Sequence, residues 1–387
     1  MKILMLNYEF PPIGGGGGQA HLSLLKQYAG RPDLEVDCLT SAPEPQFLTE
    51  QFAGNIVIYR AGIHKKDLHL WRRGEVIEWL RKATPHYRRL VKTGNYDLVH
   101  AFFAFPTGWL CYRTARLLPY ILSLRGSDVP GGNVRLQLEY KILGPLVFKP
   151  IWKHAAALVA CSGGLKARAL KFLPSADIDV IPNGIDLERF FPAPGKRGAE
   201  SPGPLRLLTV GRLSATKRLP LLVEAVELLD KQGCPVQLTI VGGGALESQL
   251  RRTLEDKDLH SVTLVGRRDS QQMPDTYRSH DVLVSASAQE GMSNSMLEAM
   301  ASGLPIVTTR CEGVDELIAD NGIVVKEANP AELAAAIRML AEDPSKRKAM
   351  ALAARTRASL FSWSSAADQY IEKYHQVLSR VGAAHPQ

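Results

Sequence analysis

The stretch that decides the fold is VLVSASAQEGMSNSMLEAMASGLP, residues 282–305. Its first four residues, Val282–Ser285, form a short apolar run that is typical of a buried strand. A loop of small and polar residues follows, and a helical pattern begins near Ser295 and ends at Gly303, a common helix stop. A strand, a loop and a helix in this order predict one unit of a parallel α/β sheet.

The same alternation continues in both directions along the 387 residues. It predicts strands at 2–6, 35–40, 56–59, 98–101, 120–124, 157–160 and 179–181 in the first half, and at 205–210, 237–241, 262–265, 282–285, 305–308 and 322–325 in the second. Helical patterns occupy most of the intervals, for example 219–232 and 331–340. Parallel sheets with helices on both faces are therefore expected.

A segment rich in proline, glycine and charge, residues 191–204, separates the two halves and indicates a linker. We therefore expect two doubly wound, Rossmann-like domains, at 1–190 and 205–365. A final helical stretch, 366–387, is expected to pack back on the first domain. Ligands of such folds bind at the carboxyl ends of the strands, so a ligand cleft is expected to face both sheets.

The net charge of +8 lies entirely in the first half. Residues 1–190 hold 24 Lys and Arg against 16 Asp and Glu, whereas residues 191–387 hold 23 of each kind. Ten of the basic residues fall within 60–92, where Trp71 and Trp79 interleave with them. This pattern favours an anionic membrane surface or acidic substrate, with a solvated helix face as the alternative. Nucleic acid is not expected, because no recognised binding motif accompanies the charge.

Other patterns bear on location and metals. The N-terminal apolar run is too short for a signal peptide, and no stretch reaches the roughly 18 apolar residues of a membrane span. We therefore expect a cytoplasmic protein, with peripheral attachment to the inner face of the cell membrane as an option. The five cysteines contain no CxxC pair, and HExxH is absent, so no metal site is predicted.

The first glycine-rich loop, Gly14 to Gly18, follows the strand at 2–6 and precedes a helix that should begin near Gln19. Free backbone N–H groups at such a helix start can bind an anion. Dinucleotide binding would require an acidic residue at the end of the second strand, where Asp37 is the candidate. A flexible loop beside a cleft is the alternative.

The second half contains further glycines at predicted strand ends. Gly211 and Arg212 follow the strand at 205–210, and Lys217 lies five residues further on. Two cations before a helix suit a diphosphate, although solvated surface charges would look the same. Gly242 and Gly266 end two further strands, where a nucleoside could approach the backbone or where the chain simply turns.

Two carboxylates mark the deciding stretch. Glu290 lies in its loop and Glu298 is expected in the first turn of the helix, and both could accept hydrogen bonds from sugar hydroxyls. An alternative exists for Glu298, since Ser295-x-x-Glu298 also reads as a capping box. That alternative does not account for Glu290-Gly291.

Together these motifs resemble the family-4 retaining glycosyltransferases of the GT-B fold (glycosyl transferases group 1). Glu290 and Glu298 match the E-x7-E motif of that family, and Gly211-Arg212 with Lys217 matches its diphosphate pair. The loop that starts Phe10-Pro-Pro, the segment 181–186 (IPNGID) and the segment 301–305 (ASGLP) resemble three further motifs, in the same order.

The resemblance implies retaining, metal-independent transfer of a sugar from a UDP- or GDP-sugar, without a cofactor, and a hexosyltransferase is expected. The implied acceptor is a glycan or a lipid-linked molecule, and a lipid-linked or cell-surface glycan precursor is expected. Glu298 would bind the ribose, Glu290 the transferred sugar, and Arg212 with Lys217 the leaving diphosphate. The implied catalytic set is Glu290, Arg212, Lys217 and His100, and the implied donor-binding set is Gly15, Gly16, Gly211, Arg212, Lys217, Gly242, Gly266, Glu290, Gly291, Met292, Ser293, Asn294 and Glu298.

The chain also departs from the family pattern. A frequent His-x-His reads His100-Ala101-Phe102 here, so that His100 is either catalytic or part of the core. A frequent His-Gly-Ser/Thr-Asp reads Arg125-Gly126-Ser127-Asp128, and Arg125 suggests an anionic group on the acceptor or donor. The acceptor-side candidates are Gly17, His21, Arg125 and Asp128. A GT-B epimerase or phosphorylase, a NAD-dependent oxidoreductase and a non-catalytic nucleotide-binding protein remain as other function classes.

Overall fold

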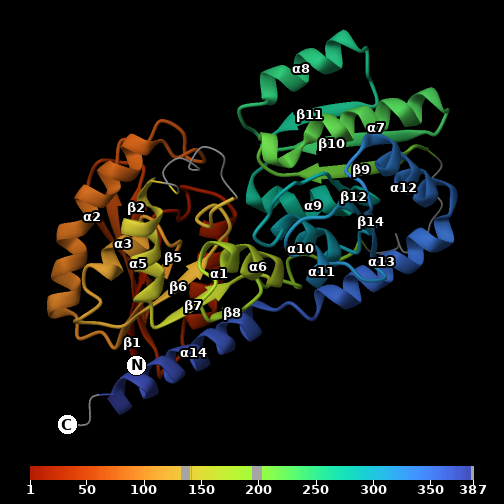
Figure 1. The fold of residues 1–387 in the computed structure, drawn as a ribbon. Coiled ribbons are helices and arrows are strands. Elements are labelled where there is room, and N and C mark those ends of the chain that lie inside the picture. Colours follow the sequence, from red (N-terminus) through yellow and green to blue (C-terminus); the bar gives the residue numbers. More distant parts are fainter. Residues whose placement is uncertain (132–139, 141, 194–202, 385–387) are drawn as a thin grey trace. The chain divides into compact units, whose positions relative to one another are not determined.

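The structure, a computed structural model, describes residues 1–131, 140, 142–193 and 203–384. It contains two compact units, Met1–Gly184 with Trp363–Gln387 and Ile185–Ser362. Most of the linker predicted at 191–204 lies outside the described residues. Each unit is an α/β layer structure with a mostly or wholly parallel sheet (Figure 1).

The first sheet has the order β3-β4-β2-β1-β5-β6-β7-β8. Its strands are β1 (Lys2–Leu6), β2 (Glu35–Ala42), β3 (Leu48–Ala53), β4 (Ile56–Gly62), β5 (Leu98–Phe102), β6 (Tyr120–Leu124), β7 (Ala157–Ala160) and β8 (Ile178–Val180). All pair in parallel except β3, which pairs antiparallel with β4.

Strand β3 is the element that the sequence pattern missed. Its residues LTEQFA are mostly exposed and show no apolar face, because the strand forms an edge of the sheet. Strands β1 and β5, by contrast, are buried almost throughout, which is why their apolar runs were recognisable.

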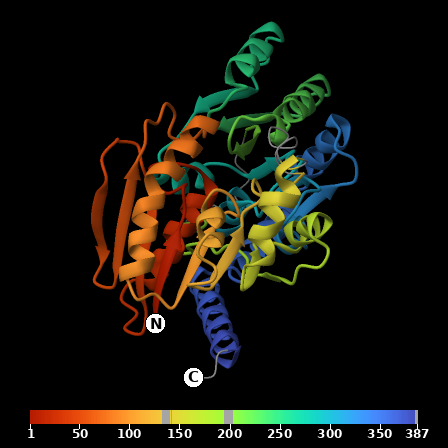
Figure 2. The ribbon, with the colours of Figure 1, turned by 60° about the vertical axis from the view of Figure 1, so that its left-hand side comes forward.

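Helices cover the first sheet. They are α1 (Gly16–Tyr28), α2 (Arg73–Thr93), α3 (Thr107–Tyr112), a short π-helix (Gly144–Phe148), α5 (Lys149–Lys153), α6 (Gly163–Phe172) and α14 (Trp363–Ala384). The long helix α2 runs across the strands beside β2 and β4 (Figure 2). The C-terminal helix α14 packs against α1.

The second sheet has the order β11-β10-β9-β12-β13-β14, and every strand is parallel to its neighbours. The strands are β9 (Leu205–Val210), β10 (Val236–Val241), β11 (Val262–Gly266), β12 (Val282–Ser285), β13 (Ile306–Thr309) and β14 (Gly322–Val325). The helices are α7 (Leu219–Lys231), α8 (Glu247–Asp256), α9 (Met273–Arg278), α10 (Asn294–Ala301), α11 (Val314–Leu317), α12 (Pro330–Glu342) and α13 (Pro344–Ala358), with short 3-10 turns at Ala215–Lys217 and Ser270–Gln272.

The boundary between the units falls at Gly184, whereas the sequence placed residues up to 190 in the first domain. Hydrogen bonds account for the difference. The Ile185 N–H donates to the Phe361 carbonyl at 2.9 Å, and Arg355 donates to the carbonyls of Phe190 and Leu187. Residues 185–190 are thereby held by the second unit.

Candidate active site

Glycines at the carboxyl edge of the second sheet bring three strand ends close together. Gly211, Gly242 and Gly266 follow or end β9, β10 and β11, and all three have positive φ. A Cβ on Gly242 would lie 1.8 Å from the Gly211 carbonyl oxygen, so only glycine fits there. Glycine at 242 therefore lets the ends of β9 and β10 approach each other closely, whereas no described atom lies within 4 Å of where a Cβ on Gly266 would be.

The two predicted cations lie on the loop between β9 and α7. Arg212 is exposed, and Lys217 ends a 3-10 turn and is partly buried. Both line a pocket at this sheet edge, together with Gly211, Ser287 and Ser295. The structure thus brings the predicted diphosphate-binding residues together with the loop that follows β12.

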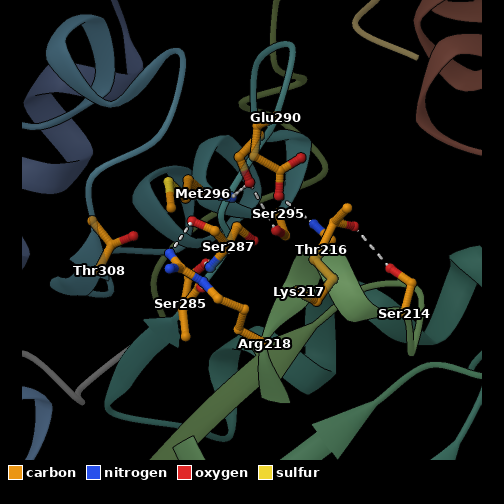
Figure 3. Close-up of polar contacts among 12 residues, drawn as sticks. Ser214, Thr216, Lys217, Arg218, Ser285, Ser287, Glu290, Ser295, Met296 and Thr308 are labelled. Atoms are coloured by element: carbon orange, nitrogen blue, oxygen red, sulfur yellow. Dashed lines mark hydrogen bonds and ion pairs between the residues drawn. The ribbon is translucent and has the colours of Figure 1, made fainter. Parts of the chain in front are cut away.

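Glu290 contacts Lys217 directly (Figure 3). The Lys217 ammonium forms an ion pair with the Glu290 carboxylate, and the two side chains are 21% and 15% exposed. The Glu290 N–H in turn donates to Glu312 at 2.9 Å. The carboxylate of Glu290 and the ammonium of Lys217 are therefore direct neighbours.

Helix α10 begins at Asn294, and Ser293 is its N-cap, with its hydroxyl accepting from the Met296 N–H. The alternative capping box Ser295-x-x-Glu298 is wrong, because Ser295 already lies inside the helix. Met292 and Ser293 are buried, and Gly291 and Asn294 flank them at the helix start. The N–H groups at this helix start are the expected position for an anion.

Glu298 lies in the second turn of α10 and points to Tyr277 of α9. The Tyr277 hydroxyl donates to the Glu298 carboxylate at 2.7 Å. Burial raises the pKa of Glu298 to about 7, and the hydrogen bond from Tyr277 opposes that rise. A carboxylate that loses hydration in this way gains from new donors, such as a pair of hydroxyls on a ligand.

Sequence reasoning missed two residues of this site. Tyr277 holds Glu298, and Arg218 hydrogen-bonds the backbone of the loop that follows β12. Neither residue belongs to a recognisable motif. Their contacts join segments that are 21 and 68 residues apart, so no local pattern could have shown them.

In the first unit, the glycine loop leads into α1, whose N-cap is Gly15. No side chain caps this end, and Gly16 and Gly17 form its first turn. A Cβ on Gly17 would lie 2.5 Å from the Phe103 ring, so the loop packs tightly against the end of β5. The candidate Asp37 for a dinucleotide lies inside β2 and accepts a hydrogen bond from Tyr96, which does not fit a ribose contact.

His21 is fully buried in α1 and stacks on Phe102, with ring centroids 4.4 Å apart. Within the described part of the chain, neither ring nitrogen has a hydrogen-bond partner. Burial and the nearby Arg125 lower the pKa of His21 to about 3, so the ring is neutral. His21 therefore lies behind the glycine loop rather than on an open surface, which corrects its assignment as an acceptor contact.

His100 is not placed for catalysis. It is fully buried, its Nδ1 lies 2.7 Å from the Tyr374 hydroxyl and its Nε2 lies 2.7 Å from the Ser123 hydroxyl. Burial lowers its pKa well below the usual range. With both nitrogens engaged inside the unit, His100 connects β5 to α14, and we correct its assignment from catalytic to structural.

Arg125 and Asp128 follow β6 and differ in role. Arg125 is partly exposed, donates to Asn183 at 2.6 Å and lies 5.2 Å from the Phe102 ring centroid. Asp128 is buried, and its carboxylate accepts from the N–H groups of Ala104, Arg125 and Gly126. Asp128 therefore shapes the loops and is not an acceptor contact. In the part of the chain that the structure describes, no carboxylate pairs with Arg125.

Two features are absent from the residues that the structure describes. No group of three or more His, Cys, Asp or Glu side chains is arranged to hold a metal ion. No helix between residues 1 and 384, gaps excluded, is both long and apolar enough to cross a bilayer.

The two sheets and the site at the edge of the second define a GT-B glycosyltransferase. Solved structures share the fold: sucrose-phosphate synthase of Thermosynechococcus elongatus has a TM-score of 0.80 at 20% identity and covers 98% of this chain and 99% of its own. HepE of Anabaena, solved with UDP and glucose, has a TM-score of 0.73 at 20% identity, over 97% of this chain and 100% of its own.

Sequence comparisons identify the family. The family model described as "Glycosyltransferase Family 4" matches residues 15–189, and the family model described as "Glycosyl transferases group 1" matches residues 204–343. A D-inositol 3-phosphate glycosyltransferase of Kineococcus radiotolerans is 30% identical over 97% of this chain and 95% of its own length. A glycogen synthase of Mycobacterium tuberculosis is 27% identical over 100% of this chain and 97% of its own length. The chain belongs to glycosyltransferase family 4.

Proposed function

We propose that this glycosyltransferase binds a nucleoside diphosphate sugar at the carboxyl edge of its second sheet and transfers the sugar with retention of configuration. The observation that carries the proposal is the ion pair of Lys217 with Glu290 beside the start of α10. Cation, carboxylate and helix start meet at one edge, where a diphosphate and a sugar would each find complementary groups.

Each part of the donor has a proposed partner. Glu298, held by Tyr277, accepts from the ribose hydroxyls, and Glu290 accepts from hydroxyls of the transferred sugar. Arg212 and Lys217 stabilise the diphosphate as negative charge develops on it, which is the role that a metal ion plays in other transferases. We propose that these two cations are sufficient and that the reaction needs no metal. Retention follows the family pattern, in which the leaving phosphate oxygen takes the proton of the acceptor.

The acceptor is proposed to carry an anionic group and to bind the first unit. Arg125 supports this, since it lies at the carboxyl end of β6 and no described carboxylate neutralises it. A phosphate or carboxylate would meet its planar guanidinium. The name of the Kineococcus relative includes a phosphorylated compound, which agrees with this proposal. A lipid-linked or cell-surface glycan precursor is an acceptor of this class.

The basic face of α2 supports peripheral attachment to an anionic membrane. Arg73, Arg81, Arg88 and Lys92 are exposed, and their spacing places them along one face of the helix. Ile77 lies on the same face and is 65% exposed. Basic side chains with an exposed apolar residue suit the headgroup region of an anionic leaflet.

Calorimetry with UDP, GDP and NAD, followed by hydrolysis assays with UDP-glucose and GDP-mannose, tests the donor. We expect one nucleoside diphosphate to bind and NAD not to bind. Arg212→Ala and Lys217→Ala should lower turnover more than they weaken nucleotide binding, because their charge matters most as the diphosphate leaves.

Metal dependence is tested in the same assay. Activity should persist in excess EDTA. Activity that disappears in EDTA and returns with Mg²⁺ or Mn²⁺ would contradict the metal-free part of the proposal, and binding of NAD alone would contradict the donor class.

A further inference from the structure

Arg218 connects the two loops of the donor site. It follows Lys217 directly and precedes α7, and its backbone is left-handed, with φ of 46° and ψ of 41°. Residues other than glycine rarely adopt this conformation, because the Cβ crowds the backbone carbonyl. The backbone of Arg218 is therefore strained beside the lysine of the proposed site. Such strain persists only where surrounding contacts stabilise it.

The guanidinium of Arg218 reaches the ends of two strands (Figure 3). Its Nε donates to the Ala286 carbonyl at 2.7 Å, and its Nη2 donates to the Ser287 carbonyl and the Thr309 hydroxyl, both at 3.1 Å. Ala286 and Ser287 follow β12, and Thr309 ends β13. Ala286 and Ser287 are almost fully buried, so their carbonyls need donors from within the protein.

The loop that Arg218 holds is the one that carries Glu290. A backbone hydrogen bond joins the same two loops beside the contacts of Arg218. The Ala288 N–H donates to the Thr216 carbonyl at 2.8 Å. Lys217 lies between Thr216 and Arg218, so both of its neighbours are attached to the loop of Glu290. The position of the Lys217 ammonium relative to the Glu290 carboxylate therefore depends on these attachments.

We infer that Arg218 is a positioning residue for sugar transfer, which holds the loop of Glu290 in register with Lys217 and acts through that loop. The inference rests on the proposed function, in which Glu290 contacts the transferred sugar. It predicts that loss of the Arg218 side chain weakens recognition of the sugar and lowers turnover, while binding of the nucleoside diphosphate alone changes little.

Arg206 provides the matched control. Its side chain also donates to a residue next to β12, since Asp281 directly precedes that strand. The Nε of Arg206 donates to the Asp281 carboxylate at 2.9 Å, and its Nη2 donates to the same carboxylate. Its contact, however, lies at the opposite ends of β9 and β12, away from Lys217 and Glu290. Loss of this ion pair should reduce stability without changing how the sugar is recognised.

The experiment compares wild-type protein with Arg218→Gly, Arg218→Lys and Arg206→Gln. Glycine removes the side chain and tolerates the left-handed backbone, so that folding is preserved. For each protein, calorimetry measures the Kd of UDP and UDP-glucose, or of GDP and GDP-mannose, and hydrolysis gives kcat, all well below the melting temperature.

We expect Arg218→Gly to lower kcat at least about tenfold, as misplaced catalytic groups do. It should also reduce the preference for the nucleotide sugar over the nucleotide, while the Kd of the nucleotide stays within about threefold. The kcat of Arg218→Lys should lie between those of wild-type protein and Arg218→Gly. Arg206→Gln should melt at a lower temperature than wild-type protein and keep the preference for the nucleotide sugar over the nucleotide.

Two results would overturn the inference: unchanged kcat and sugar preference in Arg218→Gly, or an equal loss in Arg206→Gln. A wild-type protein that binds neither nucleotide would contradict the proposed function itself, and that result is visible before any variant is compared.

Discussion

At the scale of single residues, Glu298 has an environment that makes its charge depend on pH and on ligand. Burial raises the pKa of Glu298 to about 7, and the Tyr277 hydroxyl is its hydrogen-bond donor. The donor-free domain therefore holds this carboxyl partly protonated near neutral pH. Donor hydroxyls from a ribose would favour the ionised form, so nucleotide binding should release a proton.

We accordingly predict that the affinity for nucleoside diphosphate rises as pH increases from about 6 to 8, through the pKa of Glu298. Calorimetry across this range, in buffers with different ionisation enthalpies, measures both the affinity and the proton release. The terminal phosphate of the nucleotide also titrates near pH 6. Glu298→Gln supplies the baseline for that second titration, and it should bind nucleotide more weakly at pH 8.

The same shift has a consequence for stability. A carboxyl whose pKa is raised by folding stabilises the folded state below its unfolded pKa, and this contribution is lost as pH rises through the folded value. Relative to Glu298→Gln, wild-type protein should therefore lose melting temperature between about pH 5 and 8. An identical pH profile for the two proteins, in binding and in melting, would show that Glu298 does not titrate in this way.

At the scale of elements, α14 is attached to the first sheet by a chain of buried hydroxyls. The Tyr374 hydroxyl lies 2.9 Å from that of Tyr28 in α1 and 2.7 Å from His100 in β5. The Tyr370 hydroxyl lies 2.9 Å from Ser123 in β6, which also contacts His100. The last helix of the chain thus completes the core of the unit that contains the first residues.

Tyr374→Phe tests this role. It removes one hydroxyl and leaves the Nδ1 atom of His100 and the hydroxyl of Tyr28 without their hydrogen-bond partner, which should cost about 1–3 kcal/mol of stability. Thermal unfolding measures the loss, and His375→Ala, an exposed neighbour on the same helix, is the control. We expect nucleotide affinity to remain unchanged, since His100 is structural. Equal melting of both variants would contradict this account of α14.

At the scale of the whole molecule, charge is distributed unevenly between the two halves. The excess of +8 lies within residues 1–190, and the exposed face of α2 presents Arg73, Arg81, Arg88 and Lys92. Lys82, in contrast, pairs with Glu78 and donates to the Gly62 carbonyl, so it contributes less to this face. A surface of this kind attracts anionic lipids over about a Debye length.

We predict that the protein sediments with anionic liposomes at low salt and is released at high salt, whereas neutral liposomes do not bind it. Each basic side chain near such a surface contributes about 1 kcal/mol, so replacing Arg73, Arg81, Arg88 and Lys92 with Gln should release the protein. The control replaces Arg251, Arg252, Lys346 and Lys348 in the second unit. Binding that is equal for both lipid types, or that survives the α2 substitutions, would contradict the membrane proposal.

Much of the fold followed from local patterns. Strands β1, β9 and β12 are short apolar runs, and such a run is a property of residues that are neighbours in the sequence. The motif positions of Glu290, Glu298, Arg212 and Lys217 were likewise visible, because each lies in the loop after a recognisable strand or in the helix that follows such a loop. The exposed edge strand β3 escaped detection, since it has no apolar face to reveal it.

The sequence by itself determined the family, the alternation of strands and helices and the motif residues of the proposed donor site. Only the tertiary structure decided which of these residues are buried and what they contact. His100 contacts Tyr374 across 274 positions, Lys217 contacts Glu290 across 73, and Arg218 reaches Thr309 across 91. Burial and hydrogen bonding at such separations arise from the packing of whole layers, and no period within a single strand or helix encodes them.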